Sequence, residues 1–193
     1  MNKTSTLIVS ILLMLLTLHV YAASIKGVEI PERITQTGTQ SELVLNGTGI
    51  RTKFIFDIYV GSLYLTSPST SAEEIMNSHS AKRISMHILY DRIEKEKMTN
   101  GWNDGFKNNL TSRQFTELKS EIEMFNSAFG DTLNGDEVIL DFLANNTTKV
   151  TINNLEKARI NSANFQRALL SIWLGEDPVD EDLKMAMLGL TNE

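Results

Sequence analysis

The spacing of apolar residues changes period along this chain, and those changes limit the folds it can adopt. Between residues 24 and 90 apolar side chains alternate with polar ones or gather in β-branched and aromatic runs, which predicts β-strands. Residues 98–129 place apolar side chains every three or four positions, the spacing of amphipathic helices. Strand-like segments return at residues 136–144 and 147–152, and helical spacing closes the chain. We therefore predict one α+β domain with helices laid over a sheet.

Apolar stripes mark the individual helices. Between residues 98 and 110 an apolar side chain recurs every four residues, and between residues 115 and 129 the spacing alternates between three and four. The second stripe predicts one continuous helix that ends at Gly130. A further stripe ends before Gly175, and Asp180 is a suitable N-cap for a last helix.

Residues 1–22 have the composition of a secretory signal. Lys3 precedes an apolar run over residues 7–18, and Val20-Tyr21-Ala22 is a small-residue cleavage site. The apolar run is shorter than the roughly 20 residues that a membrane-spanning helix needs. We predict cleavage, a folded domain over residues 23–193, and a periplasmic or secreted location. Retention of the segment as a membrane anchor is the alternative.

Charge and composition argue against several classes of site. Lys3 is the only charged residue of the first 22, so the rest of the chain carries a formal charge of −7, which argues against a nucleic-acid partner. The chain has no cysteine, and neither His79 nor His87 has a histidine or carboxylate at ligand spacing, so we expect no metal site. No cofactor fingerprint occurs. Gly47-Thr48-Gly49 is too short to indicate phosphate binding and predicts a bend or bulge between strands.

One arginine is placed just before an aromatic, β-branched segment. In the stretch LNGTGIRTKFIFDIYVGSLYL, residues 45–65, Arg51 and Tyr59 are an even number of positions apart. They share a face if the strand continues, and they lie opposite each other if the chain folds back near Ile55. In the second geometry the guanidinium and the phenol can converge on one ligand group, most simply a carboxylate. The structural alternative is an ion pair between Arg51 and an internal acid such as Asp57, with Tyr59 an ordinary strand aromatic.

This stretch, together with NFQRALLSIWLGEDPVDEDLK at residues 164–184, resembles the chalcone isomerase-like family, and in particular its bacterial exported branch. The resemblance covers essentially all of the chain after the signal segment, with the same order of elements. It implies an open-faced β-sandwich, in which a large curved antiparallel sheet has helices packed on one face and a ligand cleft between the two layers.

The resemblance implies two functions that use different residues. In plant chalcone isomerases a strand arginine and threonine, a helix tyrosine and asparagine, and a hydroxyl residue assist cyclisation of a chalcone to a flavanone. Arg51 matches the arginine, but Tyr59 stands at the threonine position. Met98 and Gly105 stand at the two helix positions, and Ile172 at the hydroxyl position. Because most of the polar set is missing, the resemblance favours a protein that is not an enzyme.

Fatty-acid-binding proteins of the same fold hold the ligand carboxylate with an arginine and a tyrosine, and Arg51 and Tyr59 match that pair. We therefore predict an exported, non-catalytic protein that binds a small amphipathic carboxylate such as a fatty acid, with Met98, Trp102 and Ile172 as apolar walls. Two alternatives stay open. One is an isomerase or lyase that works with Arg51 and Tyr59 alone, and the other is an interaction module of the cell envelope without a small ligand.

Overall fold

The computed structural model describes residues 22–36 and 38–191. Residues 1–21, which hold all of the predicted signal segment except its last residue, lie outside the described residues. In the part that is described, no helix is both long enough and apolar enough to cross a membrane.

Strands fill most of the chain up to residue 93 and return after residue 131, as the alternating pattern predicts. The structure adds one long edge strand that the sequence did not reveal, because its outward side chains are charged and only two of its residues turn inward. The strands are β1 (Ala22–Ile25), β2 (Val28–Pro31), β3 (Arg33–Thr35), β4 (Glu42–Lys53), β5 (Phe56–Leu65), β6 (Lys82–Ile88), β7 (Arg92–Ile93), β8 (Thr132–Leu133), β9 (Glu137–Phe142), β10 (Thr147–Ile152) and the missed edge strand β11 (Leu155–Asn161).

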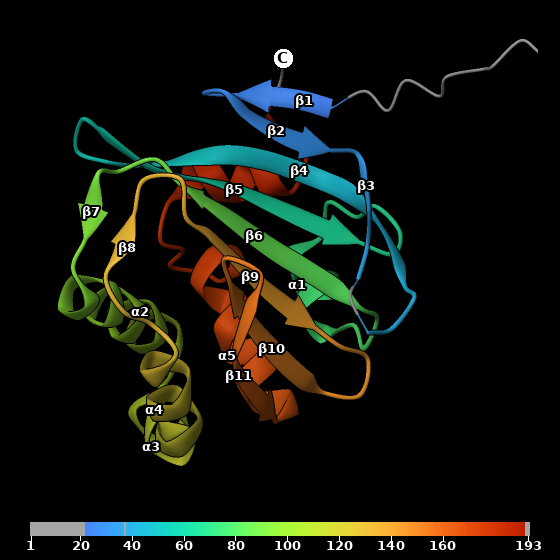
Figure 1. The fold of residues 1–193 in the computed structure, drawn as a ribbon. Helices are drawn as coiled ribbons and strands as arrows, with labels where there is room; N and C mark the ends of the chain where they lie inside the picture. The colour runs from blue at the N-terminus through green and yellow to red at the C-terminus, as the bar shows by residue number, and fades with distance from the viewer. Residues whose placement is uncertain (1–21, 37, 192–193) are drawn as a thin grey trace, which may run out of the picture.

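Seven of these strands form one curved antiparallel sheet in the order β11-β10-β9-β6-β5-β4-β3 (Figure 1). Each neighbouring pair in it is antiparallel. Two smaller ribbons, β1 with β2 and β7 with β8, flank it. The predicted α+β class and the curved antiparallel sheet are confirmed.

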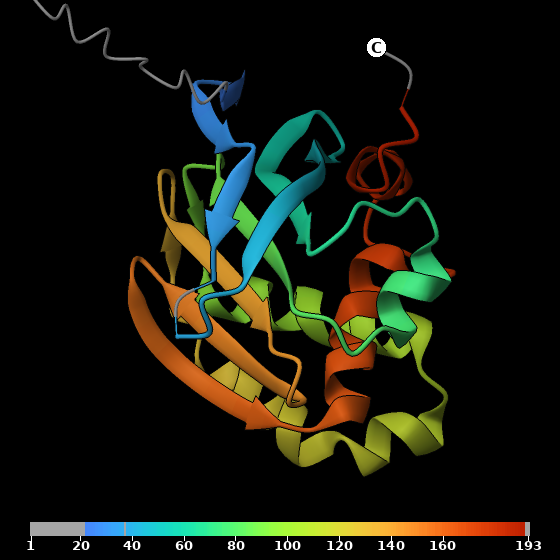
Figure 2. The same cartoon turned by 90° about the vertical axis from the view of Figure 1, so that its right-hand side faces the viewer.

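The helices lie together on one side of the sheet, so that the domain has two layers (Figure 2). Their ends follow ordinary capping chemistry: Asp180 accepts a hydrogen bond from the backbone N–H of Leu183 at 2.9 Å, as predicted. The helices are α1 (Ala72–Asn77), α2 (Lys95–Asn109), α3 (Ser112–Glu117), α4 (Lys119–Ser127), α5 (Ala163–Leu174) and α6 (Glu181–Met187).

The prediction of one continuous helix over residues 115–129 is wrong. The chain forms α3 and α4, which meet at Leu118, where ψ is 9° rather than helical. Thr111 and Gln114 form a complete capping box, which stabilises α3 as a unit of its own. Helix α3 buries none of its residues, whereas Leu118 and the apolar stripe of α4 enter the core. A one-residue break leaves the three-four spacing intact, so the sequence could not show it.

The main core lies between the sheet and the helices. Phe106, Phe125, Phe165 and Trp173 are fully buried there, and Phe125 contacts both other phenylalanines at ring-centroid distances of 6.2 and 5.7 Å. A smaller cluster lies on the other face of the sheet, where Val60 and its neighbours pack beneath β2. Strand β5 is therefore buried on both faces over most of its length, which explains why its sequence is mostly apolar rather than alternating.

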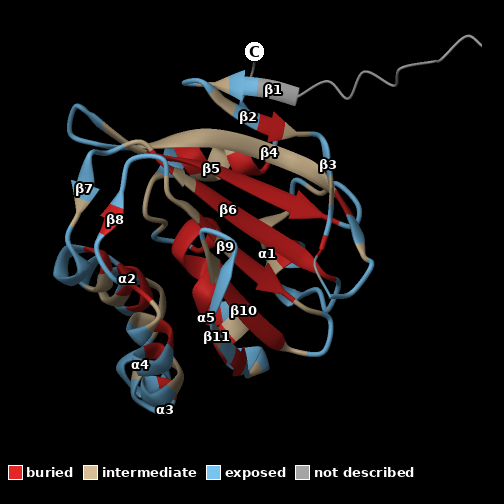
Figure 3. Ribbon diagram, viewed as in Figure 1, coloured by how far each residue is buried: buried red, intermediate tan, exposed pale blue. Residues whose placement is uncertain are grey.

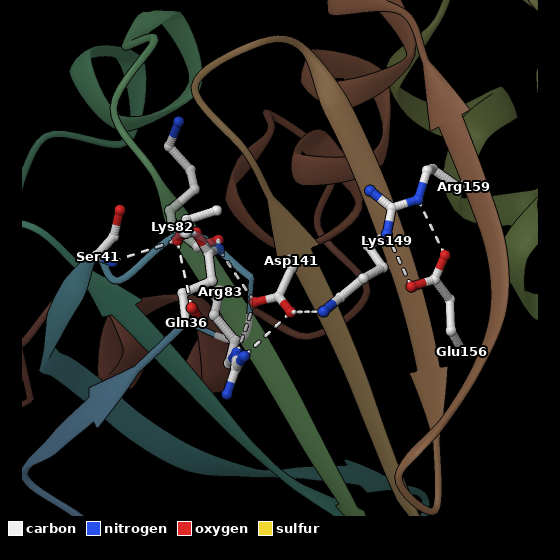
Figure 4. Close-up of polar contacts among 9 residues, drawn as sticks. Gln36, Ser41, Lys82, Arg83, Asp141, Lys149, Glu156 and Arg159 are labelled. Atoms are coloured by element: carbon white, nitrogen blue, oxygen red, sulfur yellow. Dashed lines mark hydrogen bonds and ion pairs between the residues drawn. The ribbon is translucent and has the colours of Figure 1, made fainter.

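A buried ionic network also lies on that outer face, centred on Asp141 in β9 (Figure 4). Its carboxylate is 1% exposed and accepts hydrogen bonds from Arg83 Nε at 2.7 Å and Arg83 Nη2 at 3.0 Å. Lys149 Nζ lies 3.3 Å from the same carboxylate, and Gln36 Nε2 donates to it at 3.0 Å. Because Gln36 follows β3, the network fastens the N-terminal segment to three neighbouring strands.

Helix α6 packs directly on the glycines of β4 and β5. A Cβ on Gly47 would overlap the carbonyl oxygen of Ala186, and a Cβ on Gly49 would lie 2.6 Å from the Cβ of Ala186. The bulge predicted at Gly47 is present, since the β4–β5 register shifts between Leu45 and Gly47. It lies within one continuous strand rather than between two strands. These glycines therefore serve close packing of a helix on the sheet.

Candidate ligand-binding site

A cavity of about 390 Å³ lies at the end of the two layers, between the β4–β5 hairpin, β7 and the start of α2. Its volume is within the range of pockets that hold small molecules. Most of its wall is apolar, and all five residues proposed from the sequence line it. The lining residues are Arg51, Lys53, Phe54, Phe56, Ile58, Tyr59, Met86, Tyr90, Arg92, Ile93, Lys97, Met98, Gly101, Trp102, Ile172 and Val179.

The charges at the cavity are all of one sign. Four basic residues line it, and no aspartate or glutamate does so among the described residues, although the chain as a whole carries a net charge of −6. Arg92 is paired with Asp131, and Lys97 Nζ lies 3.3 Å from Glu94. The other two, Arg51 and Lys53, make no ion pair with any residue of the described ranges. The cavity therefore offers a positive field to a ligand.

The chain folds back at residues 54–55, so Arg51 and Tyr59 are direct partners across the β4–β5 hairpin. This is the second of the two geometries considered from the sequence. The Arg51 Cζ atom lies 5.8 Å from the centroid of the Tyr59 ring, a cation–π distance. The alternative partner, Asp57, instead contacts Lys26 Nζ at 3.0 Å. Arg51 is therefore positioned by the face of Tyr59 and not by an internal carboxylate.

The hydroxyl of Tyr59, a residue that lines the cavity, is fixed by a hydrogen bond. It accepts a hydrogen bond from Trp173 Nε1 at 2.9 Å, which leaves its own proton available for donation. Burial raises the pKa of Tyr59 from 10.0 to about 12, although the nearby Arg51 acts in the opposite direction. Tyr59 is therefore a neutral hydrogen-bond donor at physiological pH and a poor candidate for a general base.

Two buried donors at the cavity have no acceptor within the described part of the chain. They are Nε of Arg51 and the indole Nε1 of Trp102. The Trp102 ring is fixed by aromatic contacts, with centroids 5.4 Å from Phe125 and 5.6 Å from Trp173. Unpaired buried donors are uncommon in folded proteins and destabilise them. Both lie on residues that a ligand in the cavity would contact.

Beyond Arg51 and Tyr59, the positions where the plant isomerases carry polar groups hold Met98, Gly105 and Ile172, none of which has a polar side chain. Met98 and Ile172 are 8% and 1% exposed and supply hydrocarbon to the cavity wall. Gly105 does not line the cavity. It faces α5, where a Cβ on it would lie 3.0 Å from Cγ2 of Ile172. Its role is to let α2 and α5 approach each other.

Part of the cavity wall carries no signal that a pattern in the sequence could reveal. Gly101 lines the cavity from the middle of α2, yet no atom lies within 4 Å of where its Cβ would be. A glycine inside a helix destabilises it by about 1 kcal/mol relative to alanine, and close packing does not explain this one, because Gly101 is exposed. Lys97 gives no such signal either, although it lies four residues before Gly101 and therefore on the same helical face.

Metal-ligating groups do not gather at this site. Within residues 22–36 and 38–191 there is no group of three or more histidine, aspartate or glutamate side chains that could hold a metal ion. What the cavity presents is a basic rim and a hydrocarbon interior.

Comparison with known proteins agrees with this architecture. A sequence model described as chalcone isomerase-like matches residues 22–189. The chain belongs to the chalcone isomerase-like family. Among solved structures, the crystal structure of a fatty-acid binding protein from Arabidopsis thaliana superposes with a TM-score of 0.61 at 16% sequence identity, over 81% of this chain and 96% of that chain. A search of curated proteins gave no significant match.

These findings confirm the family and the fold that the two sequence segments suggested. The chalcone isomerase-like chain shares the overall fold of the Arabidopsis protein, while the low identity means that the likeness concerns the fold alone. What the cavity of the present protein binds has to be argued from its own residues.

Proposed function

We propose that this chalcone isomerase-like protein binds a small amphipathic carboxylate, such as a fatty acid, in the cavity beneath the β4–β5 hairpin. The observation that carries the proposal is the lining: an apolar interior with four basic residues and no acidic one among the described residues. Such a wall matches a molecule with a negative head and a hydrocarbon body. The Arabidopsis structure is that of a fatty-acid binding protein, which supports the same class of ligand.

Arg51 is the proposed anchor for the head group. Its guanidinium has no carboxylate partner in the described part of the chain and lies over the Tyr59 ring, 5.8 Å from the centroid. A ligand carboxylate would give it charge-assisted hydrogen bonds. The neutral hydroxyl of Tyr59 is the proposed second donor, fixed in place by Trp173.

The hydrocarbon tail supplies more binding energy than the head. Hydrogen bonds to charged groups contribute about 1.5–3 kcal/mol each, whereas burial of ten methylenes contributes roughly 8 kcal/mol before the cost of association. Met98, Trp102 and Ile172 form the part of the wall that would contact such a tail. On these magnitudes the tail sets the affinity and Arg51 sets the orientation.

An isomerase or lyase reaction has less support from this geometry. Tyr59 would have to take up or release a proton, and a pKa of about 12 disfavours its ionised form at physiological pH. Apart from Arg51 and Tyr59, no polar side chain stands at the positions of the plant catalytic set. We also propose, from the composition of residues 1–22 alone, that the protein acts in the periplasm or outside the cell.

Native mass spectrometry with a mixture of fatty acids tests the proposal. The protein is purified gently and then exposed to the mixture. We expect an adduct of fatty-acid mass on the unaltered protein and a loss of affinity of tenfold or more in Arg51→Met, which keeps the bulk of the side chain without its charge. Arg33→Met, which changes an exposed arginine of β3 outside the cavity, is the matched control.

A second variant separates loss of binding from loss of folding. Gly101→Leu would fill the cavity from α2 while it replaces a poor helix former by a good one, so we expect it to exclude the ligand without a lower melting temperature. A protein that takes up no fatty acid would contradict the proposal. Equal affinity in Arg51→Met and Arg33→Met would contradict the role of Arg51.

A further inference from the structure

The tip of the β4–β5 hairpin carries consecutive large apolar residues that the fold leaves in solvent. Phe54 is 89% exposed, Ile55 86% and Phe56 49%, and Figure 3 shows this projecting loop as exposed. Single exposed apolar residues are ordinary, but three in a row at a protruding tip form a patch that usually marks an interaction site.

The backbone of this tip is also unusual. Residues 54 and 55 form a two-residue turn between the paired residues Lys53 and Phe56. Phe54 has φ +58°, a conformation that glycine, asparagine or aspartate normally adopts in hairpin turns. A bulky side chain there is a strained choice that the turn itself does not require. The residue in this conformation is also the most exposed of the three apolar residues at the tip, at 89%.

The surroundings of the tip combine aromatic and basic side chains. Lys53 precedes it, and the Phe56 ring meets the Tyr90 ring edge-on at 5.6 Å. Arg92 and Lys97 share the same cavity wall, each beside one acidic partner, whereas Lys53 makes no ion pair with a described residue. Protruding apolar side chains beside basic and aromatic residues are typical of proteins that insert into the bilayer interface.

We propose that this tip docks on an anionic lipid bilayer, with Phe54 and Ile55 entering the interface and Lys53 facing the head groups. A second copy of the chain is a poorer fit, because a stable protein interface buries about 800 Å² on each partner and three side chains at a narrow protrusion fall well short of that. The local positive charge, in a chain of net charge −6, complements an anionic surface.

The docking surface lies at the mouth of the cavity, because Phe54 and Phe56 belong to both. Docking would therefore bring the cavity to the membrane, so that an amphipathic ligand could pass between the bilayer and the cavity without crossing water. This last step rests on the proposed function, whereas the docking itself does not and is measured without added fatty acid.

Vesicle binding tests the proposal. The protein is mixed with vesicles of phosphatidylcholine containing phosphatidylglycerol, or of phosphatidylcholine alone, and sedimented. We expect stronger binding to the anionic vesicles and a loss of about tenfold in Phe54→Asn. Asparagine suits φ +58°, so this variant removes the apolar ring without strain on the turn. Leu155→Asn is the matched control, because Leu155 is 61% exposed on the edge strand β11 and does not line the cavity. Residues 1–22 are treated identically in all variants, so their contribution cancels.

A site-specific label gives an independent readout. Because the chain has no cysteine, an environment-sensitive dye on Ile55→Cys reports only from the tip. We expect a blue shift with anionic vesicles for this label and none for a label on Leu155→Cys. Equal vesicle binding by Phe54→Asn and the unaltered protein, or concentration-dependent self-association that Phe54→Asn abolishes, would overturn the proposal. The Arg51→Met variant, which should lose fatty acid, should still bind the vesicles, so the two proposals can fail separately.

Discussion

Two arginine–carboxylate pairs on the same sheet differ in burial, and their comparison yields the sharpest stability prediction. In the buried pair Asp141 contacts Arg83 and Lys149, whose side chains are 11% and 9% exposed. In the other pair Arg159 makes two hydrogen bonds to Glu156, at 2.9 and 2.8 Å, with both side chains about half exposed (Figure 4). The perturbations are Asp141→Asn and Glu156→Gln, which remove one charge each and preserve shape.

The two substitutions should differ several-fold in effect. Asp141→Asn leaves two buried cations without a carboxylate, and removal of one partner of a buried pair destabilises a protein by about 3–5 kcal/mol. Glu156→Gln removes a solvent-exposed pair. Such pairs contribute at most about 1 kcal/mol to the free energy of unfolding. The free energy of unfolding of a domain is about 5–15 kcal/mol in total. We therefore expect Asp141→Asn to remain folded, with only a small free energy of unfolding left.

Urea unfolding at neutral pH is the assay. The free energy of unfolding of such a domain falls by about 2 kcal/mol per molar urea. We therefore expect the urea concentration at the unfolding midpoint to fall by roughly 1.5–2.5 M in Asp141→Asn and by less than about 0.5 M in Glu156→Gln. The slope should not change, because the unfolded surface is the same. Similar midpoints for the two variants would refute the argument that burial, rather than pairing geometry, determines the contribution of these pairs.

Further predictions concern packing, pH and helix stability. Gly47→Ala should destabilise the fold by about 1–3 kcal/mol, because its Cβ meets the backbone of α6 and that helix must move; thermal unfolding measures this, and a neutral effect would show that α6 adjusts freely. Burial raises the pKa of Tyr59 from 10.0 to about 12, so folding favours the protonated phenol, and its contribution is complete below pH 10 and is lost between pH 10 and 12, by up to about 2–3 kcal/mol. Urea titrations across that range should show a smaller decline in Tyr59→Phe. Gly101→Ala should raise the melting temperature, since the helix gains about 1 kcal/mol and nothing lies within 4 Å of the new Cβ; a lower value would mean that the glycine is needed for packing.

The candidate site shows how far sequence spacing can reach. The even separation of Arg51 and Tyr59 restricted them to one face or to opposite positions, and the turn at Phe54 and Ile55 decided in favour of opposite positions. The sequence could not show that Trp173, more than a hundred residues later, donates to the Tyr59 hydroxyl. Such a contact depends on how α5 is placed over the sheet, which no local pattern specifies.

The sequence by itself determined the alternation of strand and helix regions along the chain, the N-cap of the last helix and the family, because apolar period and capping are local properties of the chain. Only the tertiary structure decided that the second apolar stripe breaks at Leu118, that Gly47 and Gly49 lie under α6, and that the basic residues converge on one cavity. Each of these depends on contacts between segments that are distant in the chain. Side-chain spacing carries no information about distances between such segments.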